Sequence, residues 1–221
     1  VLGNQKVMYC ISPSIHPAAG STIFSAFISN HDLAEVLVRY FRSRGFKRLA
    51  MITSTDATGQ SAKQGVEDAM KPPENSSMEM VASVRFNPTD VSVSAQVGQM
   101  RAANPQAVIA WTTGAPMGTV LKGMAQGGLD LPTATTDSNM TYVQMDQYAD
   151  FLPSEMLYMS SPWPPHGSEL QLPAGVDEQI KAMFAAYKAV GKSPDMAAPA
   201  IWDAGLLTAA ALRELGLTAT P

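Results

Sequence analysis

The hydrophobic and polar positions of the chain alternate between two patterns. Short, continuous apolar runs that end at polar or proline residues predict buried β-strands at residues 7–11, 48–53, 78–86, 107–111, 132–136 and 156–159. Amphipathic segments with apolar residues three and four positions apart predict helices at residues 31–44, 59–70, 93–100, 117–124, 176–190 and 201–215. Strands that alternate with helices in this way predict βαβ units, and hence a parallel sheet flanked by helices in an α/β fold.

The first predicted helix shows how the pattern is read. Its larger apolar residues recur at the spacing of one helical face: Leu33, Val36, Leu37, Tyr40 and Phe41. Asp32 lies in its first turn and Arg42 near its end, where each charge complements the helix dipole, and Gly45 supplies the stop signal. This segment therefore predicts a helix that packs one face against the sheet.

The pattern changes after the Pro-Trp-Pro-Pro segment at residues 162–165, which we interpret as a crossover between two lobes. Two helices follow it without strands of their own to cover, and the helix at 201–215 is apolar all round. Val1 is not a start methionine, and residues 216–221 come directly after a helical segment. We therefore expect a mature or trimmed chain, and a fragment of a longer one is consistent with this pattern.

Composition excludes several classes of protein. Apolar residues make up 46% of the 221 residues and charged residues 15%, which argues against a disordered chain or a coiled coil. The net charge of −4 without a basic block argues against nucleic-acid binding. No run of eighteen apolar residues exists, so no membrane-spanning segment is predicted, and the single cysteine, Cys10, cannot form an internal disulfide.

The sequence lacks the common motifs of catalysis and cofactor binding. It has no dinucleotide-binding, P-loop or nucleophile-elbow pattern. The three histidines, His16, His31 and His166, lie far apart and share no metal-ligand spacing. We therefore predict no catalytic residue, no metal and no cofactor.

Polar loops follow four of the predicted strands, at residues 12–17, 54–59, 112–116 and 136–139. The carboxyl ends of parallel strands meet at one edge of a sheet, where ligands bind in such folds. Hydroxyl groups, among them that of Thr113, and free N–H groups at helix starts suit a carboxylate or another small anion. Ordinary helix capping by Ser, Thr and Asp explains each loop separately, so both interpretations stay open here.

The chain resembles the type I periplasmic binding proteins of the branched-chain amino acid transporter group. The segments that carry the resemblance occur in the same order along nearly the whole chain: Ile-Ser-Pro-Ser-Ile-His-Pro at 11–17, Arg-Gly-Phe-Lys-Arg-Leu-Ala-Met-Ile at 44–52, Asp-Ala-Thr-Gly at 56–59, Phe-Asn-Pro-Thr-Asp-Val-Ser at 86–92, Asn-Pro-Gln-Ala-Val-Ile at 104–109, Gly-Gly-Leu-Asp-Leu-Pro at 127–132 and Pro-Ala-Ile-Trp-Asp-Ala at 199–204. Each segment is loosely defined alone, and together they are specific.

The resemblance implies two Rossmann-like lobes hinged around a ligand cleft. Residues 1–30 would hold the end of lobe one and the hinge, residues 31–162 the complete lobe two, and residues 163–221 a truncated return to lobe one. It further implies a periplasmic, non-enzymatic protein that delivers a small carboxylate-bearing solute to the membrane permease of an ABC transporter. If lobe one is truncated, the chain is expected to form a dimer or exchange segments through its uncovered apolar faces.

The resemblance also assigns ligand-binding positions. Ser14, Ile15 and His16 fall where the family grips a carboxylate, and Asp137 falls near the acid that accepts an α-ammonium group.

Two further ligand-binding positions, Thr58 and Ala115, replace frequent tyrosines of the family, which leaves room for a bulkier ligand. His16 replaces a small hydroxyl residue and adds a donor that is charged near neutral pH. An aromatic or other organic acid therefore competes with a branched-chain amino acid as the ligand.

Two other functions are weighed against solute transport. A sensor domain of a regulator or receptor with the same fold would need an attached DNA-binding or membrane segment, and none is visible in the sequence. A small α/β hydrolase or transferase would need a nucleophile paired with a base, and no motif supplies one.

Overall fold

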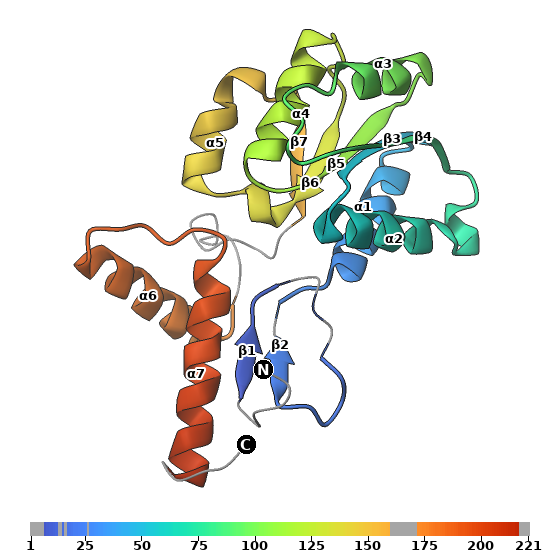
Figure 1. The fold of residues 1–221 in the computed structure, drawn as a ribbon. Coiled ribbons are helices and arrows are strands. Elements are labelled where there is room, and N and C mark those ends of the chain that lie inside the picture. Colours follow the sequence, from blue (N-terminus) through green and yellow to red (C-terminus); the bar gives the residue numbers. More distant parts are fainter. Residues whose placement is uncertain (1–6, 13–14, 16, 26, 160–171, 217–221) are drawn as a thin grey trace. The chain divides into compact units, whose positions relative to one another are not determined.

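The computed structural model describes residues 7–12, 15, 17–25, 27–159 and 172–216. The chain divides into two compact units (Figure 1). Unit 1 comprises Val1–Ser29 and Ser161–Pro221, and unit 2 comprises Asn30–Ser160. Unit 2 covers nearly the same residues as the lobe predicted over residues 31–162. The arrangement of two lobes around a cleft stays a prediction.

Unit 2 is built on a parallel sheet of five strands in the order β4-β3-β5-β6-β7. The strands are β3 (Arg48–Ser54), β4 (Glu79–Phe86), β5 (Ala107–Trp111), β6 (Thr133–Thr136) and β7 (Met156–Met159). The helices between them are α1 (Asn30–Ser43), α2 (Ala57–Met70), α3 (Ser94–Ala102), α4 (Ala115–Gln126) and α5 (Tyr142–Tyr148), with 3₁₀ turns η1 (Pro73–Asn75), η2 (Asp137–Asn139) and η3 (Ala149–Phe151). The predicted α/β class is confirmed.

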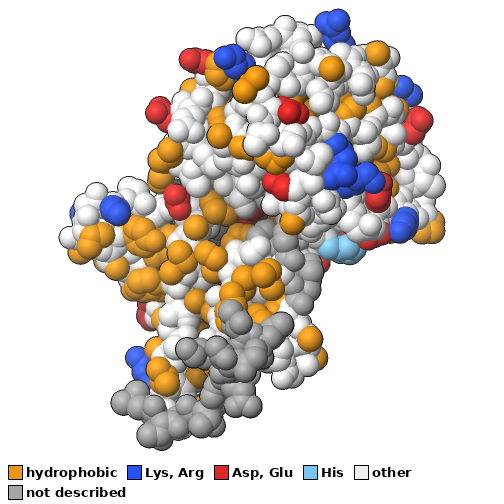
Figure 2. All heavy atoms as spheres, in the orientation of Figure 1, with side chains coloured by type: hydrophobic (Ala, Val, Ile, Leu, Met, Phe, Trp, Pro, Cys, Tyr) orange, Lys and Arg blue, Asp and Glu red, His pale blue; other side chains and the backbone are white. Residues whose placement is uncertain are grey.

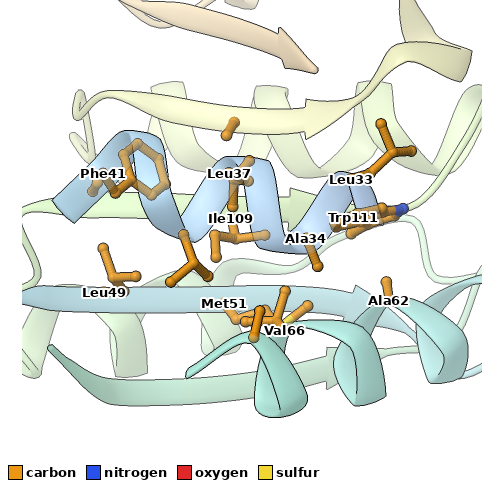
Figure 3. Packing of buried hydrophobic residues seen from close by; sticks show 14 of the residues in the cluster. Leu33, Ala34, Leu37, Phe41, Leu49, Met51, Ala62, Val66, Ile109 and Trp111 are labelled. Atoms are coloured by element: carbon orange, nitrogen blue, oxygen red, sulfur yellow. The ribbon is translucent and has the colours of Figure 1, made fainter. Parts of the chain in front are cut away.

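Two apolar cores lie on opposite faces of this sheet, because successive strand residues point to opposite faces. Ile109 and Trp111 of β5 belong to the core beneath α1 and α2, whereas Val108 and Ala110 belong to the core beneath α3 and α4. Figure 3 shows the first core, with side chains of both helices directed at β3 and β5. Burial on both faces explains why these strands are continuous apolar runs in the sequence.

Unit 1 contains a small parallel pair of strands, β1 (Met8–Cys10) and β2 (Ile23–Ser25), and two helices, α6 (Ala174–Ala189) and α7 (Ala198–Leu215). The indole Nε1 of Trp202 in α7 donates to Gln179 Oε1 of α6 at 3.4 Å. No helix among the described residues is both long and apolar enough to span a membrane.

Most predicted elements occur within three residues of their expected bounds. The sequence does not predict β2 or α5, because a strand of three residues and a helix of seven are too short to give a clear periodic signal. The predicted helical face of α1 is also partly wrong at Val36, whose side chain is exposed, since the buried stripe follows Leu33, Leu37 and Phe41.

Candidate functional site

The carboxyl ends of three neighbouring strands bring together four of the predicted ligand-binding residues. β3, β5 and β6 are adjacent in the sheet. Thr58 lies in the first turn of α2 after β3, Thr113 and Ala115 lie at the junction of β5 and α4, and Asp137 opens the turn after β6. Because the strands are parallel, all four positions lie at one edge of the sheet.

The loop after β3 is held by a helix cap. The Asp56 carboxylate accepts hydrogen bonds from Ser54 Oγ at 2.6 Å and from the Gly59 amide at 3.0 Å. The bond from Gly59 satisfies an N–H group at the start of α2, so the Asp56 carboxylate serves as the cap of this helix. Thr58, between Asp56 and Gly59, is half-buried at this fixed turn.

The loop after β5 presents Thr113 and Ala115. Thr112 is buried, Thr113 is half-buried and Ala115 is exposed. The amide of Asn139 holds this loop, because its Nδ2 donates to the carbonyl oxygen of Thr112 at 2.7 Å and its Oδ1 accepts from the Gly114 amide at 3.2 Å. The sequence places Asn139 in a polar loop without a role, and the signal that points to it is an amide side chain in the first turn after a buried strand.

Asp137 is a buried carboxylate at the same edge. Its side chain is 5% exposed, and its Oδ1 accepts from Thr136 Oγ1 at 3.1 Å. No cation pairs with it among the described residues. Burial raises the pKa of Asp137 from its ordinary value, against the lowering effect of hydrogen bonds from Thr136 and from the backbone.

The remaining predicted positions belong to unit 1. Ile15 lies after β1, with an exposed side chain and with its backbone N–H donating to the Ser12 carbonyl at 3.3 Å. Ser14 and His16 lie outside the described residues. A carboxylate grip by this loop stays a prediction.

Unit 2 also holds a histidine–carboxylate cluster and a hollow. His31, Asp32 and Glu35 bring three possible metal-ligand atoms within 4.8 Å of one another, but all three are exposed on one helical turn, and His31 already lies 3.7 Å from Glu35. A hollow of about 210 Å³ lies beside the end of α4 and η3, between Leu121, Leu129 and Phe151. None of the predicted ligand-binding residues lines this hollow.

A parallel α/β unit with a polar edge at its strand ends defines a class of ligand-binding folds. The family model described as periplasmic binding protein matches residues 2–221, so the chain belongs to this family. The predicted type I membership is confirmed.

Solved structures share the fold at low sequence identity. An extracellular ligand-binding receptor from Rhodopseudomonas palustris HaA2 is 18% identical with a TM-score of 0.81, and the match covers 100% of this chain and 62% of that one. The branched-chain amino acid transporter substrate-binding protein LivJ from Streptococcus pneumoniae, in complex with isoleucine, is 17% identical with a TM-score of 0.76, covering 94% and 57%. The leucine-binding protein LivK from Thermotoga maritima is 13% identical with a TM-score of 0.76, covering 97% and 59%.

The match spans about three fifths of the length of these three structures. The comparison with curated proteins finds no match.

Proposed function

We propose that this chain is the solute-binding component of an ABC transporter and captures a small carboxylate-bearing solute. The observation that carries the proposal is the edge of unit 2, where Thr58, Thr113, Ala115 and Asp137 follow three adjacent parallel strands. Family membership supports ligand binding as the general role. The protein then works by binding and release, without converting its ligand.

The chemistry of the edge favours a ligand that also carries a cationic group. Asp137 is a buried acid without a cationic partner among the described residues, so a ligand ammonium would relieve the cost of burying its charge. The structure of LivJ holds isoleucine, which supports an amino acid. Thr58 and Ala115 contribute little bulk, so the ligand is branched, aromatic or otherwise wide.

Unit 1 would supply the other half of the grip in this proposal. Ser14, Ile15 and His16 would hold the carboxylate, with His16 as a charged donor. Closure of the two lobes would bury the ligand and create the form that a membrane permease recognises, and the periplasm is the compartment in which such a protein works.

Ligand-dependent thermal shifts test the proposal. The purified chain is screened with the common L-amino acids, with benzoate and with phenylacetate. A ligand at one hundred times its Kd stabilises the folded state by about 2.7 kcal/mol. We expect at least one carboxylate to raise the midpoint and to be recovered unchanged by mass spectrometry. If no carboxylate raises the midpoint, or if the ligand is consumed, the proposal is wrong.

A further inference from the structure

The loop between β5 and α4 adopts a backbone conformation that needs support. Gly114 has φ of +69° and ψ of −143°, a region that residues with a side chain rarely adopt. Glycine has the largest conformational freedom to lose, so the sequence of this loop does not fix its shape by itself. The shape must therefore be imposed by its neighbours.

Asn139 supplies one part of that support. Its side chain is fully buried, and its Nδ2 donates to Thr135 Oγ1 at 2.9 Å in addition to the Thr112 carbonyl. With the bond from the Gly114 amide, the same side chain connects the end of β6 to both ends of the loop. A buried amide with its oxygen and nitrogen both paired is costly to disturb, because each partner would be left unsatisfied.

Tyr148 supplies the other part from α5. It is 1% exposed, and its hydroxyl donates to the Gly114 carbonyl at 2.7 Å. The same carbonyl accepts the Met117 amide at 2.9 Å, so it is fixed between α5 and the first turn of α4. The ring packs beside Gly118, where an added Cβ would lie 3.3 Å from Tyr148 Cε1.

We propose that Asn139 and Tyr148 are positioning residues that hold the β5–α4 loop in its ligand-ready conformation. Neither side chain reaches the surface, so they act through Thr113 and Ala115, which the loop presents at the sheet edge. A loop that is ordered before binding loses little entropy when the ligand arrives. The effect on affinity rests on the proposed function, whereas the effect on loop order does not.

Matched variants separate positioning from general stability. Asn139→Ala is paired with Asn75→Ala, because Asn75 is also a buried amide whose Nδ2 donates to a backbone carbonyl, that of Ala69 at 2.7 Å. Tyr148→Phe is paired with Tyr40→Phe, which removes a hydroxyl that accepts from Arg44 at 2.6 Å. Both control residues lie away from the candidate site: Tyr40 is in the last turn of α1, before β3 begins, and Asn75 ends η1, before β4 begins.

The first measurement is amide hydrogen exchange of residues 112–118 in the full chain without ligand. We expect exchange in this segment to become about tenfold faster in Asn139→Ala and Tyr148→Phe, the scale of losing one hydrogen bond, and to stay unchanged in the two controls. If Asn139→Ala lowers the thermal midpoint as much as Asn75→Ala but leaves exchange at 112–118 unchanged, both residues are only structural and the proposal is overturned.

The second measurement is calorimetric titration with L-isoleucine, L-phenylalanine and benzoate. For each probe that binds the parent, we expect about tenfold weaker binding in Asn139→Ala and Tyr148→Phe, and parental affinity in the controls. Faster exchange with parental affinity would overturn the link between loop order and binding. If none of the three binds the parent, the proposed carboxylate specificity fails for these probes, and the exchange result still decides whether the two residues hold the loop.

Discussion

Asp137 is buried and has no cationic partner among the described residues, so its charged form is disfavoured in the folded protein. Its pKa is raised by burial, so between the ordinary value of 3.8 and the raised value the folded protein keeps a proton that the unfolded chain has released. The folded state therefore loses stability as the pH rises through that interval.

Asp137→Asn removes the charge while keeping an oxygen that accepts from Thr136. We expect the variant to be more stable than the parent at pH 7, with a difference that disappears at a pH where the parent residue is protonated. Denaturant unfolding at several pH values measures this, with the exposed Asp150→Asn as control. A loss of stability at pH 7 would show that the carboxylate is stabilising as a charged group.

The same substitution distinguishes ligand classes. Loss of a charge-assisted bond of about 1.5–3 kcal/mol predicts 10- to 100-fold weaker binding of an amino acid. Binding of an acid without an ammonium group is expected to be unaffected or improved, because like charges no longer oppose each other. Calorimetric titration with phenylalanine and phenylacetate makes this comparison. Equal losses of affinity for both ligands would show that Asp137 does not bind an ammonium group.

The most specific functional prediction from the sequence concerns His16. A charged histidine that donates to a carboxylate contributes about 1.5–3 kcal/mol, so His16→Ala should weaken binding of a carboxylate ligand by one to two powers of ten in the intact protein. Affinity should also fall as the pH rises through the titration of the histidine, since the neutral ring donates less strongly. Titration of ligand at several pH values tests both expectations. Parental affinity and an unchanged pH profile in His16→Ala would show that His16 has no role in ligand binding.

At the scale of elements, the start of α2 lies against the end of β3. A Cβ at Gly59 would lie 2.0 Å from the carbonyl oxygen of Ser54, which is a backbone atom and cannot rotate away. We expect Gly59→Ala to destabilise the protein by about 2 kcal/mol or more and to displace the loop that carries Thr58.

The control for this prediction is Gly98→Ala in α3. Nothing lies within 4 Å of a Cβ at Gly98, so alanine should stabilise the helix by about 0.5–1 kcal/mol. Thermal unfolding of the two variants tests the contrast. Similar midpoints would mean that α2 does not approach β3 as closely as described.

Elements were predictable where one physical signal dominated. β5 has the bounds expected from its apolar run, because both faces of the strand are buried. β2 and α5 are held by their surroundings, as when Tyr148 of α5 reaches the Gly114 carbonyl across 34 residues of sequence. Such support from distant residues leaves no local pattern, so the loops at the sheet edge are predictable from the sequence but the contacts that order them are not.

At the scale of the whole molecule, unit 1 exposes much of its apolar surface. Figure 2 shows apolar side chains gathered over the surface of this unit. On α7 the only buried residue is Ala198, and Ile201, Leu212 and Leu215, which share one helical face, are 54%, 40% and 67% exposed. Large apolar side chains that are exposed together on one helical face favour burial against a partner.

We expect the chain to self-associate through α7 as its concentration rises, because burial of apolar area releases about 25 cal/mol per Å². Ile201→Lys combined with Leu215→Lys should keep the chain monomeric to higher concentration, since a charge on this face would have to be desolvated on association. The matched control is Val91→Lys combined with Val143→Lys, at two residues of unit 2 that are 96% and 67% exposed. Sedimentation velocity across a concentration series measures the outcome. A parent chain that stays monomeric at every concentration, or a control pair that disperses the chain equally well, would show that the α7 face is not what drives association.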